Sequence, residues 1–290
     1  MKRLTDRWGF MRVSAAALIA VVALGVTASY WPTFEPFKKD MDCARFSRVF
    51  LMGLSVANPD YYVNYHLEPA AECDESSFAG SMRIGISPRL PESGLTGSPM
   101  LYATIRQDSP EVIDVPRLEP WKLTEALIAF GDETAEARNR EVIELLRGLN
   151  AFKFHVQAVI ELENPLNEEE VRGLHDIGIG EVALFSPGDG RKPIGWPFPY
   201  PCTVGVFDLC GDKESKSRVG EFRRWVSMLR PEDAPALEEF GLDLSNLQRR
   251  AQDGLIYGFT INNTAEAVTA LAKNPKVRSV RVIEITPSGS

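Results

Sequence analysis

The order of apolar and polar positions changes from one segment of the chain to the next. Three segments alternate apolar and polar side chains, as a strand buried on one face does; they are residues 61–67, 81–87 and 100–106. Residues 133–149 instead follow a helical spacing, which places four apolar side chains on one face (Val142, Leu145, Leu146 and Leu149) and charged side chains on the other. This pattern predicts a strand-rich region that leads into an amphipathic helix.

The C-terminal half repeats one order of elements. A strand, a helix and a strand are predicted at 154–162, 168–175 and 181–185, and again at 255–261, 264–273 and 277–285. Each helix follows an Asn with a Glu three residues later (Asn167 and Glu170, Asn263 and Glu266), which is the pattern of a capping box. Two β-α-β units form a ferredoxin-like split β-α-β arrangement, with both helices on one face of an antiparallel sheet. We therefore expect an α+β fold.

An insertion separates the two units. Residues 187–201 are rich in Pro and Gly with three aromatic residues between them, and helices are predicted at about 214–229 and at 244–251, before Gly254. The aromatic residues are Trp196, Phe198 and Tyr200. Exposed aromatic side chains beside Pro turns are typical of recognition loops, so these three are interaction candidates. The alternative is that they fill the core beneath this loop.

The N-terminus has the pattern of a membrane segment. Residues 13–34 contain no charged side chain and follow a basic tail, residues 1–12. A span of about 20 apolar residues crosses a bilayer, and the basic tail places the N-terminus in the cytoplasm. We expect a transmembrane helix, a juxtamembrane helix at 37–52, a strand-rich extracytoplasmic region over 35–150 and a C-terminal α+β domain over 151–290. The alternative is a signal peptide that is cleaved near Ala28, after which the domain is secreted.

The net charge of −8 combines two unequal parts of the chain. The first twelve residues carry +3, so the remaining residues carry −8 − 3 = −11. Such an acidic domain lacks the dense Lys and Arg footprint of a nucleic-acid binder, so we expect no nucleic-acid partner.

All four cysteines follow the predicted membrane segment, where an oxidising environment permits disulfides. They are Cys43, Cys73, Cys202 and Cys210, and four cysteines allow three sets of pairs. Pairing between neighbours in the sequence would join Cys43 to Cys73 and Cys202 to Cys210. A metal site is the alternative, but the chain has no Cys-x-x-Cys motif.

Candidate chemistry is sparse. The sequence contains no nucleophile elbow, zinc-protease, phosphate-loop or dinucleotide-binding motif, and its three His residues lack the spacing of metal ligands. The run Glu168-Glu169-Glu170 lies at a predicted helix N-terminus, where acids stabilise the helix dipole; a cation site is the alternative. We therefore predict no catalytic, cofactor or metal residue and a protein that is not an enzyme.

Several segments carry a family resemblance. They are the basic and then apolar N-terminus, 57–63 (Ala-Asn-Pro-Asp-Tyr-Tyr-Val), 160–171, 253–260 (Asp-Gly-Leu-Ile-Tyr-Gly-Phe-Thr), 264–268 and 274–278. The chain resembles the sigma-factor-regulator family, which comprises membrane-anchored anti-sigma factors of Gram-positive bacteria. The resemblance implies an envelope regulator with an outer sensing domain, whose partner is an extracytoplasmic-function sigma factor or another envelope protein. The alternative function is a secreted or anchored binding protein of the envelope without enzymatic activity.

Overall fold

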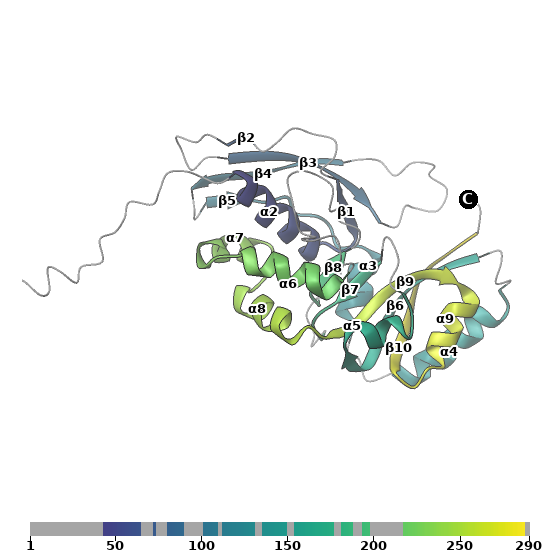
Figure 1. The fold of residues 1–290 in the computed structure, drawn as a ribbon. Coiled ribbons are helices and arrows are strands. Elements are labelled where there is room, and N and C mark those ends of the chain that lie inside the picture. The colour runs from purple at the N-terminus through teal and green to yellow at the C-terminus, as the bar shows by residue number, and fades with distance from the viewer. Residues whose placement is uncertain are drawn as a thin grey trace, which may run out of the picture. The chain divides into compact units, whose positions relative to one another are not determined.

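The structure is a computed structural model, which describes the chain in ten segments (Figure 1). They are residues 43–64, 72–73, 80–89, 101–109, 112–130, 135–149, 154–176, 181–187, 193–197 and 217–287. All of them belong to one compact unit, Asp40–Ser290. This unit contains helices and two antiparallel sheets, which confirms the α+β class.

The predicted membrane segment, 13–34, lies outside the described residues. Among the helices that are described, none has both the length and the apolar composition that crossing a bilayer requires.

The first sheet, sheet A, is built from the N-terminal part of the unit. Its strands are β1 (Tyr61–Asn64), β2 (Glu72–Cys73), β3 (Gly80–Pro88), β4 (Leu101–Ser109) and β5 (Val112–Asp114), in the order β1-β3-β4-β5 with β2 also paired to β3. Ile84, Ile86 and Ile105 are buried on one face, whereas Tyr102 is half exposed and lies beneath the Arg83 guanidinium, 4.4 Å from its ring centre. This one-sided burial explains the alternation in the sequence, and the strands predicted at 81–87 and 100–106 are confirmed.

Helix α2 (Cys43–Ala57) is the central buried helix of the unit. Every residue from Val49 to Ala57 is buried, because this stretch is apolar apart from Ser55. It contacts β1, the short strand β8 (Gly195–Pro197) and helix α7 (Ala234–Glu239). The helix predicted at 37–52 therefore extends to Ala57, where Asn58 Nδ2 donates to the carbonyl of Leu54 at 2.8 Å.

The second sheet, sheet B, contains the two predicted β-α-β units. Its strands are β6 (Phe154–Leu166), β7 (Val182–Leu184), β8, β9 (Ile256–Thr264) and β10 (Val277–Pro287), in the order β10-β6-β9-β7-β8 with every neighbouring pair antiparallel. Helix α5 (Glu168–Arg172) connects β6 to β7, and α9 (Ala265–Ala272) connects β9 to β10. The strands and helices predicted for the two units are thus confirmed.

Both faces of sheet B are covered. Helices α4 (Ala135–Arg147) and α9 lie side by side and pack on the sheet (Figure 1). A separate cluster joins helix α3 (Lys122–Ile128) to side chains from alternate positions of β6 and β7; it consists of Leu123, Leu127, Phe130, Val159, Val182 and Leu184. Gly258 of β9 allows this close packing, because a Cβ there would lie 2.7 Å from the Phe130 ring. The sequence pattern did not predict α3.

The insertion between the units forms α6 (Arg218–Met228), a 3₁₀ turn at Pro231–Asp233, α7 and α8 (Leu244–Asp253). The predicted stop at Gly254 is confirmed, since this residue ends α8 with φ +63°. The Asn167 capping box is also confirmed, with both of its reciprocal hydrogen bonds present.

The second predicted cap is wrong. Thr264, not Asn263, caps α9, and its side chain accepts from the backbone N–H of Ala267. The Asn263 side chain instead accepts from the N–H of Thr264. Both residues suit a helix start, and the extended backbone of Thr264 places the first turn one residue later than we expected.

Candidate functional site

The structure buries the first of the three aromatic interaction candidates. Trp196 lies in β8 opposite Ala183 of β7 and is 0% exposed. A partner cannot reach such a side chain, so Trp196 belongs to the core, which was the alternative interpretation of this segment. Phe198 and Tyr200 lie outside the described residues.

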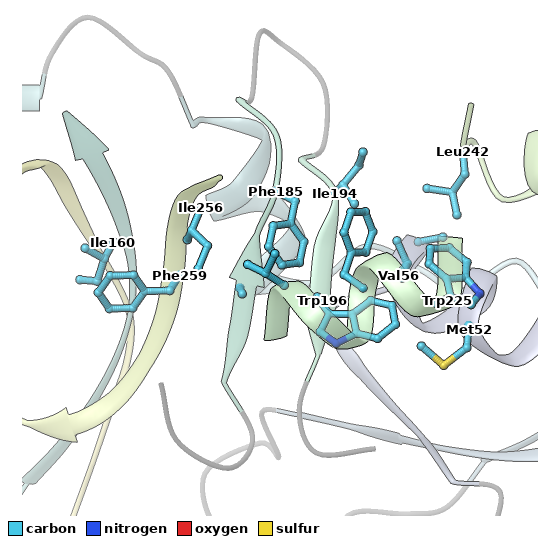
Figure 2. Close-up of a cluster of buried hydrophobic side chains, with 14 of the residues drawn as sticks. Met52, Val56, Ile160, Phe185, Ile194, Trp196, Trp225, Leu242, Ile256 and Phe259 are labelled. Carbon is cyan, nitrogen blue, oxygen red and sulfur yellow. The ribbon is translucent and has the colours of Figure 1, made fainter. Parts of the chain in front are cut away.

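Trp196 is part of an aromatic cluster of four buried side chains, which are Phe185, Trp196, Phe222 and Trp225. The ring centres of Phe185 and Phe222 are 4.5 Å apart and nearly parallel, and Trp196 lies 5.6 Å from both Phe222 and Trp225. Figure 2 shows Phe185, Trp196 and Trp225 of this cluster on the side of Ile256 and Phe259 where Met52 of α2 also lies. The aromatic cluster therefore joins sheet B, α6 and α2 into one core.

Two charged residues are buried beside the aromatic cluster. Trp196 Nε1 donates to Glu221 Oε2 at 3.2 Å, and Glu221 and Arg218 are only 3% and 6% exposed. Burial raises the pKa of Glu221, although the bond from Trp196 and the charge of Arg218 oppose this shift. Burial likewise lowers the pKa of Arg218 to about 10. Opposite charges and hydrogen bonds thus offset part of the cost of burial, which is a structural role.

The Glu168-Glu169-Glu170 run stabilises two helix N-termini. Glu170 completes the capping box of α5. The Glu168 carboxylate accepts from Ser217 Oγ at 2.5 Å and from the backbone N–H of Arg218 at 2.9 Å, at the start of α6. Within the described residues, no group of three or more His, Cys, Asp and Glu is placed to hold a metal ion.

The disulfide candidates are only partly described. Cys43 begins α2 and Cys73 ends β2, but the structure describes only the backbone of these two residues. Cys202 and Cys210 lie outside the described residues altogether. The disulfide pairing stays a prediction.

A polar pocket lies on the face of sheet B that α3 covers. Its cavity volume is about 120 Å³, and it is lined by Tyr62, Arg89, Leu123, Gln157, Ala158, Glu181, Thr260, Ile261, Asn262 and Ile283. These residues come from sheet A, α3 and four segments of sheet B. Ligand sites are typically concave, with a few polar groups among apolar walls, so this pocket is the candidate functional site.

Glu181 supplies negative charge to the pocket. It is 5% exposed, and its Oε1 accepts from the backbone N–H of Asn262 at 3.0 Å. His175 Nε2 lies 3.3 Å from both carboxylate oxygens, and the His175 ring stacks on Phe259 with 5.7 Å between ring centres. These contacts fix the carboxylate beside β9.

Arg89 supplies positive charge. It is 9% exposed, and its guanidinium lies over the Tyr62 ring at 4.1 Å, a cation–π contact. The backbone N–H of Arg89 donates to the carbonyl of Asp60 at 2.7 Å, which holds the end of β3 beside β1. The pocket therefore contains one buried charge of each sign.

Gln157 supplies a hydrogen-bond acceptor. Its Oε1 is buried and accepts no hydrogen bond in the structure. Gln157 lies opposite Asn262 in the β6–β9 ladder, so both side chains are on the same face of the sheet. Leaving such an acceptor unsatisfied costs roughly 1–3 kcal/mol, which a ligand with a donor would recover.

Asp60 positions the α3 wall of the pocket. Its 2% exposed carboxylate accepts from the backbone N–H groups of Trp121, Leu123 and Thr124 at 2.9–3.2 Å. This satisfies the free N–H groups at the start of α3 and holds Leu123 against the pocket.

No pattern in the sequence predicted the pocket residues. The available signals were a polar Gln157 within the otherwise apolar run 156–160 and the acidic Glu181 directly before a buried strand. Neither signal identifies a site without the fold that brings Arg89 beside them.

Comparisons with known proteins add no relative: no protein-family model, no curated protein and no solved structure matches the chain. The resemblance to sigma-factor regulators therefore rests on the sequence segments alone.

Proposed function

We propose that this chain is a membrane-anchored regulator of the cell envelope, of the anti-sigma-factor type, whose outer α+β domain senses a small ligand and has no enzymatic role. The observation that carries the sensing role is the polar pocket, with buried Arg89 and Glu181 and the unsatisfied acceptor of Gln157. A buried acceptor such as Gln157 Oε1, which faces a cavity without a hydrogen bond, costs free energy unless a ligand donates to it.

The ferredoxin-like arrangement is part of this proposal. It is supported by the order β10-β6-β9-β7, in which β9 lies between the ends of the first unit (β6 and β7) and β6 lies between the ends of the second (β9 and β10). Two β-α-β units that interleave in this way form a split β-α-β sheet. Asn262 of β9 and Glu181, which directly precedes β7, both line the pocket.

The anchor is tested by fractionation. A retained anchor predicts a full-length chain in the membrane fraction, whereas N-terminal sequencing of a chain from the medium that begins at Ser29 would show cleavage and remove the tail, residues 1–12.

The regulatory role is tested by deletion of the gene. We expect the transcripts of one extracytoplasmic-function regulon to rise, and we expect the tail to capture a sigma factor. Unchanged transcripts of every such regulon, with no captured sigma factor, would contradict the anti-sigma role and leave the alternative, an anchored or secreted binding protein that uses the same pocket.

A further inference from the structure

The polar pocket contains separate partners for the hydrogen-bond donors and for the hydrogen-bond acceptors of a ligand. Glu181 and Gln157 both lie next to Asn262, the first through a hydrogen bond to its backbone N–H and the second as its partner in the ladder. A carboxylate and an amide oxygen at one place favour a cationic group with several N–H donors, such as an ammonium group.

The opposite charge of the pocket comes from sheet A. Arg89 is held over Tyr62 at 4.1 Å and brings a guanidinium to the same cavity. A guanidinium has only donors and matches the planar geometry of a carboxylate. Arg89 and Glu181 both line the cavity, so one ligand that carries an anionic and a cationic group can find a partner for each of them there.

The size and the apolar walls narrow the ligand further. A cavity of roughly 150 Å³ holds the six carbon atoms of benzene, so a volume of about 120 Å³ suits a molecule of comparable size. Leu123 and Ile283 line the same cavity and suit a small apolar group. A free amino acid with a small side chain has an ammonium group, a carboxylate and a methyl group within six heavy atoms.

We propose that the polar pocket binds a small zwitterionic amino acid, with its ammonium group at Glu181 and Gln157 and its carboxylate at Arg89. This deepens the sensing role proposed above and rests on it for its biological meaning. The binding itself depends only on the pocket.

The test is calorimetric titration of the full chain in detergent with L-alanine. Ethylamine and propionate serve as probes that keep only one of its charged groups. We expect saturable binding of L-alanine and binding of each single-charge probe at least about tenfold weaker, because each loses one charge-assisted contact. No saturable heat up to about 10 mM L-alanine, or equal binding of either probe, would overturn the proposal.

Variants distinguish a loss of ligand binding at the pocket from a loss of folding. Gln157→Met keeps the length of the side chain and removes the acceptor, so we expect affinity to fall by about tenfold or more. The matched control is Gln248→Met, an exposed position on α8 that should leave affinity unchanged. Equal affinity in wild type and Gln157→Met would overturn the assignment.

The ligand proposal and the regulatory role can fail independently of each other. Binding of L-alanine with no change in any regulon on gene deletion would leave the ligand site in place and overturn only the regulatory role. A regulated regulon with no binding would overturn only the ligand class.

Discussion

The aromatic cluster and the polar pocket show two ways in which this domain buries polar atoms. Each contains a buried atom without a hydrogen bond in the structure: Trp225 Nε1 in the aromatic cluster and Gln157 Oε1 in the polar pocket. Trp225 lies among packed rings, whereas Gln157 faces a cavity that also contains buried charges of both signs. An unsatisfied atom therefore indicates binding only where space and complementary groups accompany it. Substitutions in the cluster should change stability, and substitutions in the pocket should change ligand binding.

The largest effect is expected from Trp196→Ala in the aromatic cluster. It removes a fully buried indole and leaves the buried Glu221 without its donor, so we expect the free energy of unfolding to fall by about 3–5 kcal/mol, the range for large aromatic truncations. Chemical denaturation of the purified chain measures this change. A variant that unfolds within 1 kcal/mol of wild type, at the precision of such measurements, would show that the cluster does not hold the core together.

Asp60→Ala tests a residue that connects the core to the pocket. It leaves up to three backbone N–H groups at the start of α3 without an acceptor, so we expect a loss of about 2–3 kcal/mol and weaker ligand binding, because Leu123 loses its fixed position. Asp60→Asn keeps one acceptor oxygen, so its stability should lie between those of wild type and Asp60→Ala. Denaturation and titration measure the two effects, and a stability loss with unchanged affinity would separate α3 from the pocket.

These two sites also show how far sequence reasoning extends. The C-terminal units were predicted because their signals are local: short, largely apolar runs at β6 and β9, and a capping box that joins Asn167 to Glu170 three residues later. Helix α3 was missed because Asp60, about sixty residues earlier in the chain, supplies the cap for its start. Trp196 could not be placed because Pro-rich sequence is equally compatible with a loop and with the short buried strand β8.

The polar pocket could not be predicted for the same reason. Its charged residues come from the end of β3 and from the residue before β7, which are separated by about ninety positions and meet only when sheet A packs near sheet B. Local patterning determines which segments form strands, whereas the site depends on how the two sheets are brought together.

A smaller effect is expected from Asn167→Ala, which changes a helix cap away from both regions. Loss of the capping box of α5 should cost about 1 kcal/mol, because one backbone N–H loses its acceptor. Ligand affinity should stay unchanged. Glu169→Ala is the matched control, since Glu169 is exposed in the same turn and makes neither bond of the box. Equal stability losses in the two variants would attribute the effect to charge and not to the cap.

The smallest effect is expected from acid at Asp243, which caps α8 beside α6 of the aromatic cluster. Hydrogen bonds from Ser245 Oγ and from the backbone N–H of Asn246 lower the pKa of Asp243 below its ordinary value.

A carboxylate whose pKa is lower in the folded state than in the unfolded state stabilises the fold at a pH above its unfolded pKa. This stabilisation is lost as the pH falls through the folded pKa. The loss should therefore begin below about pH 4, the ordinary range of Asp. Asp243→Asn keeps a good cap without a titrating group, so the thermal midpoints of wild type and variant should diverge only in acid. If the thermal midpoints of wild type and Asp243→Asn instead fall in parallel between pH 6 and pH 3, carboxylates other than Asp243 cause the loss of stability in acid.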